Sequence, residues 1–105
     1  MTMKEYVLQN FGYEMKTTFW DDFSIADHFG IDAIKDTYKR AFEEWKSDVV
    51  YLTELVMVLN WKIWYFFGRN DTLGKLYDSL WREADAWAVE NLKDDDLSYF
   101  LRTTD

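Results

Sequence analysis

Residues 49–67 read VVYLTELVMVLNWKIWYFF and form the most apolar segment of the chain. The segment is about as long as a membrane span, but it contains Glu54, Asn60 and Lys62, which are costly at the centre of a bilayer. Wound as a helix, it carries apolar residues on nearly every side, which is typical of a helix that is central to its domain or lies in an oligomer interface. The segment therefore predicts a buried central helix.

Helical periodicity continues on both sides of this segment. From Ile34 to Trp45, apolar residues recur at i, i+4, i+7, i+8 and i+11, which is one face of an α-helix. A 3.6-residue period also continues for five turns after Asp71, which is in capping position. Ser47 is the expected cap of the central helix, and Gly30 suits the left-handed position that ends a helix. The expected helices cover residues 19–29, 32–46, 48–67, 72–92 and 95–101, with a turn at 68–70.

The first 17 residues are harder to interpret. Their apolar side chains fit no clean period, so a short helix, an extended strap and a strand across the bundle all remain open. Aromatic residues in this leader indicate that it docks on the rest of the chain. With no proline and only four glycines, the sequence predicts one all-α domain over 1–105. It should be a compact bundle of about four to five helices, with a leader (1–17) and a helical core (18–105).

Charge and cysteine content exclude several functions. The 105 residues include 20 acidic and 12 basic side chains, for a net charge of -8. This balance argues against direct binding of nucleic acid, which requires Lys and Arg, and against an anionic membrane as partner. The chain has no cysteine, so disulfides, thiolate zinc sites and cysteine nucleophiles are excluded. Without disulfides or a secretory leader, the expected location is the cytoplasm.

No motif predicts catalysis, a cofactor or a metal. His28 is the only histidine, and the three aspartates 94–96 suit the positive end of a helix dipole. Glu54 is the one acid within the most apolar helix and is the candidate buried carboxylate, paired with Lys62 or with a basic group from another helix. A structural role for Glu54 is favoured over a binding role. The chain is accordingly expected not to be an enzyme.

The six tryptophans indicate an interface. Trp45 and Trp87 lie on apolar stripes and are expected in the core, whereas four others are not accounted for in this way. Trp61 and Trp64, three residues apart, would form an exposed ridge, a common form of anchor in protein interfaces. Alternatively, the leader or the last helix covers them. The candidate interface residues are Trp61, Trp64, Tyr65 and Trp81.

Three further stretches carry a resemblance: FSIADHFGIDAIKDTYKRAFEEWKSD at 23–48, YLTELVMVLNWKIW at 51–64 and LSYFLRTTD at 97–105. Together they resemble small acidic helical proteins encoded on conjugative transposons and prophage-like elements of gut Firmicutes. The resemblance covers the chain from about Thr18 to its end and leaves out the leader. It implies a genomic setting, an accessory gene on a mobile element, and brings no functional residues with it.

Three functions are weighed on these grounds. The first is a non-enzymatic helical protein that works through protein contacts as an accessory of a mobile element. The second is an acidic DNA mimic that inhibits a nucleic-acid-binding host defence protein, although the basic residues are interleaved with the acids. The third, a metal-binding or enzymatic bundle, has the least support. A homodimer is compatible with each, because the central helix could supply a symmetric interface.

Overall fold

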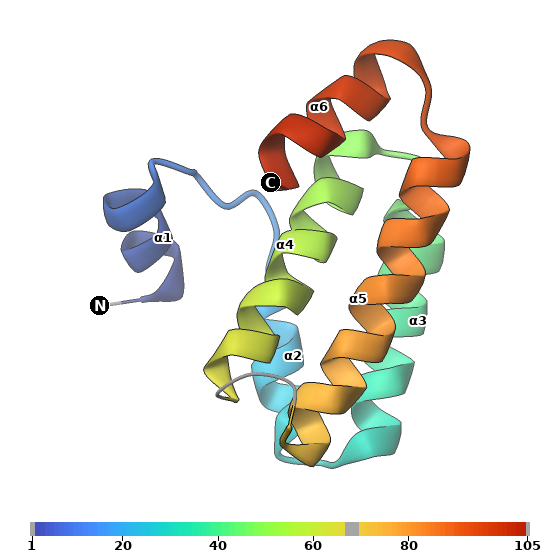
Figure 1. Ribbon diagram of the computed structural model, residues 1–105. Helices are drawn as coiled ribbons and strands as arrows, with labels where there is room; N and C mark the ends of the chain where they lie inside the picture. Colours follow the sequence, from blue (N-terminus) through green and yellow to red (C-terminus); the bar gives the residue numbers. More distant parts are fainter. Residues whose placement is uncertain (1, 67–69, 105) are drawn as a thin grey trace.

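The computed structural model describes residues 2–66 and 70–104, and within these ranges the chain is all-α (Figure 1). The fold class is as predicted, but there are six helices in this part of the chain instead of four to five, because the leader forms one of its own. The helices are α1 (Met3–Phe11), α2 (Phe19–Asp27), α3 (Ile31–Trp45), α4 (Val49–Tyr65), α5 (Thr72–Asn91) and α6 (Asp94–Thr104).

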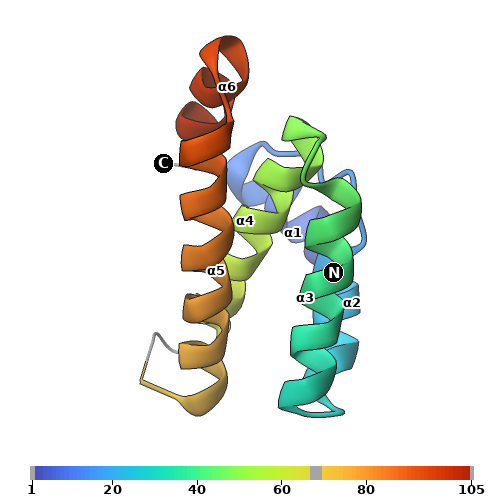
Figure 2. The ribbon, with the colours of Figure 1, turned by 90° about the vertical axis from the view of Figure 1, so that its right-hand side faces the viewer.

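Helix α4 is the centre of the bundle, as its apolar sequence predicts. It contacts α5 along its length and also packs against α2, α3 and α6. Figure 2 shows α4 between α5 on one side and the pair α2 and α3 on the other. Because α4 has neighbours on several sides, its buried residues follow no single stripe. They include Leu52, Leu55, Val56, Val58, Leu59 and Ile63.

Side-chain caps and glycines set the helix ends. The cap of α4 is Asp48 and not Ser47 as expected: the Asp48 carboxylate accepts a hydrogen bond from the Val50 amide at 3.0 Å. Asp71 caps α5 as predicted. Gly30, with φ of 101°, forms the turn between α2 and α3, although α2 has already ended at Asp27. The turn expected at 68–70 lies largely outside the described residues.

The leader combines two of the conformations left open by its sequence. Its first part is α1, which ends at Gly12 in the left-handed conformation, with φ of 65°. The strap, defined here as Gly12–Thr18, then runs along α4 to the start of α2 (Figure 1). Val7 of α1 and Met15 of the strap are buried. The leader therefore docks on the bundle, with α1 to one side of α4 (Figure 1).

Candidate interaction site

Aromatic side chains from three helices line one open groove, which we call the aromatic groove. Helix α4 contributes Trp61, Trp64 and Tyr65 from its last two turns, at spacings that place them on one side of the helix. The remaining aromatic residues come from α1 and α2. The groove has a volume of about 780 Å³, and its lining is Thr2, Met3, Tyr6, Phe11, Trp20, Asn60, Trp61, Trp64 and Tyr65.

Ring contacts join the helices that form this groove. Phe11 of α1 stacks on Trp61 of α4, with ring centroids 6.3 Å apart and planes inclined by 15°. Trp20 of α2 meets Tyr65 edge to face at 5.9 Å. Among the residues that the structure describes, Trp64 has no such ring partner, and it is 71% exposed. Two pairs of rings in contact thus line the groove, and the exposed Trp64 is available to anchor a partner.

Glu54 holds the strap that places α1 beside α4. The side chain is completely buried, and it accepts four hydrogen bonds from the leader. The Lys16 and Thr17 amides each donate to it at 2.7 Å, the Tyr13 hydroxyl donates at 2.9 Å, and the Thr17 hydroxyl donates as well. Burial, reinforced by the Glu54 charge, raises the pKa of Tyr13, so Tyr13 remains a donor. Glu54 is buried as expected, and its role here is to anchor the strap.

Lys62 lies in a second buried polar cluster, and its ion-pair partner is not Glu54. The side chain is 1% exposed, and its ammonium lies 2.9 Å from Asp27 and 2.7 Å from the Ser24 hydroxyl. The expected pairing of Glu54 with Lys62 is therefore wrong. The two residues are eight positions apart on α4, which separates them by about 12 Å along the helix axis.

The surroundings of Lys62 connect this cluster to the aromatic groove. Its ammonium lies 4.3 Å from the centroid of the Trp20 ring and 5.3 Å from that of Tyr65. Burial lowers the pKa of Lys62, and hydrogen bonding to Asp27 acts in the opposite direction. The other Asp27 oxygen accepts from the Tyr77 hydroxyl. Trp20 and Tyr65 therefore already hold a cation from the chain itself, which makes the groove less suited to a cationic ligand.

The short distance between Ser24 and Lys62 raises the question of a serine nucleophile activated by lysine. Such a pair needs a neutral lysine that can accept the hydroxyl proton. Here Asp27 lies within ion-pair distance of the same ammonium and favours its charged form. The Lys62 side chain is also enclosed, so a substrate has no direct access to it. The geometry favours a structural ion pair.

The predicted interface residues fall into two neighbouring hollows. Trp61, Trp64 and Tyr65 lie together in the aromatic groove, whereas Trp81 of α5 lines an adjacent hollow between the strap, α4 and α6. Trp61 belongs to both. Trp45 and Trp87, expected in the core, pack against it but are only partly buried. Sequence reasoning missed Tyr6, Phe11 and Trp20 as groove residues.

No residue grouping in the described chain resembles a metal site. Within residues 2–66 and 70–104, no three His, Asp or Glu side chains lie close enough together to hold a metal ion. None of the helices in these ranges is both long and apolar enough to cross a membrane. Comparison with protein-family models, with curated proteins and with solved structures found no match to this chain.

Proposed function

We propose that this protein is a non-enzymatic interaction protein that binds an apolar segment of another protein in the aromatic groove. The observation that carries the proposal is the gathering of six aromatic side chains from α1, α2 and α4 around one open groove, with Trp64 exposed. Tryptophan and tyrosine are enriched among the residues that dominate binding energy in protein interfaces. They bury a large area while few side-chain torsions become fixed.

The chemistry of the lining favours an apolar occupant. Thr2 and Asn60 bring polar side chains to the groove, beside the hydroxyls of Tyr6 and Tyr65, and among the described residues no charged side chain lines it. Lys62 supplies a cation to two of the rings. Anchoring by apolar side chains of a partner, with one or two hydrogen bonds to the polar groups, matches the usual composition of a binding groove. The proposed setting is the cytoplasm, as an accessory of a mobile genetic element, on the grounds of the missing cysteines and the resemblance described above.

Charge distribution gives less support to the DNA-mimic alternative. Such a mimic needs a continuous field of unpaired carboxylates. Several acids instead contact a basic residue three or four positions further along the chain, which partly neutralises them. These pairs are Asp36 with Arg40 at 3.3 Å, Glu43 with Lys46 at 3.2 Å and Asp78 with Arg82 at 2.9 Å.

Trp64→Ala tests the proposal directly. Because Trp64 is exposed, its truncation should change the free energy of unfolding by less than about 0.5 kcal/mol. Val89→Ala on α5 is the matched control, since Val89 is also exposed and lies outside the groove. Wild type and both variants would serve as tagged baits in lysate from a Gram-positive host, with captured proteins identified by mass spectrometry.

The expected result is a protein captured by wild type and Val89→Ala and lost with Trp64→Ala. Direct titration of that purified protein should then show at least tenfold weaker binding to Trp64→Ala. Identical captures by all three baits would contradict the proposal. A solution mass of twice the monomer that reverts to the monomer in Trp64→Ala would also contradict it, since the groove would then bind a second copy.

A further inference from the structure

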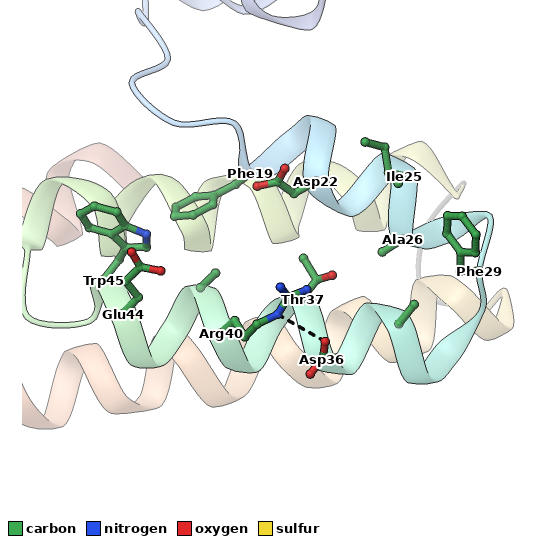
Figure 3. A pocket seen from close by; sticks show the side chains of 12 residues that line it. Phe19, Asp22, Ile25, Ala26, Phe29, Asp36, Thr37, Arg40, Glu44 and Trp45 are labelled. Atoms are coloured by element: carbon green, nitrogen blue, oxygen red, sulfur yellow. Dashed lines mark ion pairs between the residues drawn. The ribbon is translucent and has the colours of Figure 1, made fainter.

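A second groove lies between α2 and α3, and in the part of the chain that the structure describes it shares no residue with the aromatic groove. The two helices pack side by side and are joined by the short turn at 28–30. The groove has a volume of about 460 Å³, and Figure 3 views it with α4 and α5 behind. Four of the residues that line it have small side chains: Ala26 on α2, and Ala33, Thr37 and Ala41 on α3. Small residues allow the backbone of a third helix to approach closely.

Larger apolar side chains lie at both ends of this groove. Phe19 and Trp45 lie at one end, and Ile25 and Phe29 lie toward the other (Figure 3). Phe29 is 76% exposed, the highest value for a large apolar side chain among residues 2–66 and 70–104. The nine residues of α2 span about 13 Å. A helix lying in the groove can therefore reach both ends with apolar residues at i, i+4 and i+7.

The charged residues of the groove are mostly acidic. Asp22 on α2 and Asp36 and Glu44 on α3 contribute three carboxylates, and Arg40 is the one basic residue of the lining within the described ranges. Arg40 already contacts Asp36, and both side chains are well exposed (Figure 3). The remaining negative potential attracts Lys or Arg on a partner and repels phosphate and acidic surfaces.

We propose that the groove between α2 and α3 binds an amphipathic α-helix from another protein, one that carries Lys or Arg beside its apolar stripe. The apolar stripe lies over Ala26, Ala33 and Ala41, with larger side chains against Phe29 and Trp45, because Trp45 is only partly buried. Basic side chains flanking the stripe reach Asp22 on one rim and Glu44 on the other. The site is independent of the aromatic groove and requires different chemistry of its partner.

Two synthetic helical peptides of equal length form the probe. Both carry leucine at i, i+4 and i+7, and the flanking positions are lysine in one and glutamate in the other. Binding is followed by amide chemical shifts of the full-length isotope-labelled protein. Saturable binding of the lysine peptide is expected, at least tenfold tighter than the glutamate peptide and weaker as salt rises. The largest shifts are expected along Ala26, Ala33 and Ala41.

Variants locate the binding on the protein. Thr37→Trp fills the groove and should weaken the lysine peptide at least tenfold, whereas Lys39→Trp on the exposed outer side of α3 should change it less than twofold. Glu44→Gln removes a rim charge without adding volume and should weaken binding about threefold. Glu90→Gln on α5 is its charge-matched control. The Glu44 comparison keeps the test decisive if Thr37→Trp does not fold.

Three results would overturn the assignment. The first is absence of saturable binding by the lysine peptide. The second is equal affinity for the two peptides. The third is a set of shifts centred on Trp61 and Trp64, which would place the peptide in the aromatic groove. None of these results bears on the capture experiment with Trp64→Ala, so the two sites are tested separately.

Discussion

Replacement of Glu54 by glutamine tests the role of the strap. The substitution keeps the size and shape of the side chain but leaves one acceptor oxygen where the carboxylate has two. Four donors from the leader converge on that carboxylate, two of them backbone amides. In Glu54→Gln, the new NH₂ group must face either the Thr17 amide or the pair formed by Tyr13 and Lys16. One backbone N–H of this part-buried cluster therefore loses its acceptor in either orientation.

The magnitude follows from these contacts. An unpaired buried donor costs about 1–3 kcal/mol, and hydrogen bonds that lose a charged acceptor retain roughly half their strength. The expected loss in the free energy of unfolding is about 2–4 kcal/mol. If the strap leaves the bundle to regain hydrogen bonds with water, the loss is limited to the free energy with which the leader docks. The Lys16 and Thr17 amides become accessible to solvent in that case.

Two measurements check this prediction. Urea unfolding gives the loss of stability, and thermal unfolding should show a midpoint lower by roughly 8–16 °C. Hydrogen exchange followed by NMR should show faster exchange at the Lys16 and Thr17 amides, with Leu55 and Leu59 of α4 still protected. Glu90→Gln, an exposed change of the same chemistry, should be neutral within about 0.5 kcal/mol. The reasoning is refuted if Glu54→Gln is as stable as wild type and Lys16 and Thr17 exchange slowly.

Three other changes probe the remainder of the fold. Asp27→Asn leaves Lys62 charged and buried without its counter-ion, so urea unfolding should show a loss of about 3–5 kcal/mol in the free energy of unfolding. Asp36→Asn, which breaks an exposed ion pair, is the control and should lose less than about 1 kcal/mol. Gly30→Ala should lose about 1–3 kcal/mol in the same assay because φ of 101° strains any L side chain, although a new Cβ would meet no atom within 4 Å; a loss below 0.5 kcal/mol would contradict this. Burial raises the pKa of Tyr13, Tyr38 and Tyr77 above 10. As pH rises, the unfolded chain therefore loses these protons before the folded chain does, so the contribution of these groups to stability is present below pH 10 and lost as pH rises further. The lowered pKa of Lys62 has the opposite effect, since its cost falls as pH rises toward 10.5. Because the three tyrosines outnumber the one lysine, we expect tyrosinate absorbance to appear above pH 10 together with loss of helical circular dichroism. Titration of the tyrosines at their ordinary pKa of 10 without unfolding would argue against their burial.

The long helices were predictable because their apolar residues repeat over many turns. Helices α3 and α5 match their predicted ranges to within one residue at each end. Over such lengths, one face buries enough apolar surface to override local ambiguity. The cap of α4 was missed by one position, since Ser47 and Asp48 are both good capping residues and only the backbone conformation selects between them.

The leader was less predictable for a physical reason. Helix α1 has nine residues and only Val7 fully buried, so it presents no apolar stripe to recognise. Tyr6 and Phe11 line the aromatic groove, and the contact of Phe11 with Trp61 of α4 depends on the path of the strap. That path is set by backbone amides that donate to Glu54, and a backbone amide has no signature in the sequence. Burial of Glu54 was predictable from its apolar surroundings, whereas its partners were not.

Glu54 and the aromatic groove are coupled through the strap, although Glu54 does not line the groove. The carboxylate fixes residues 13–17, these residues place α1, and α1 brings Phe11 onto Trp61 at 6.3 Å. Release of the strap removes one wall of the groove and exposes Trp61, while Trp64 and Tyr65 remain on α4. Glu54→Gln should therefore shift tryptophan emission to longer wavelength and weaken partner binding with Trp64 intact. Trp64→Ala should weaken binding with the strap still docked, which separates a positioning residue from one that contacts the partner.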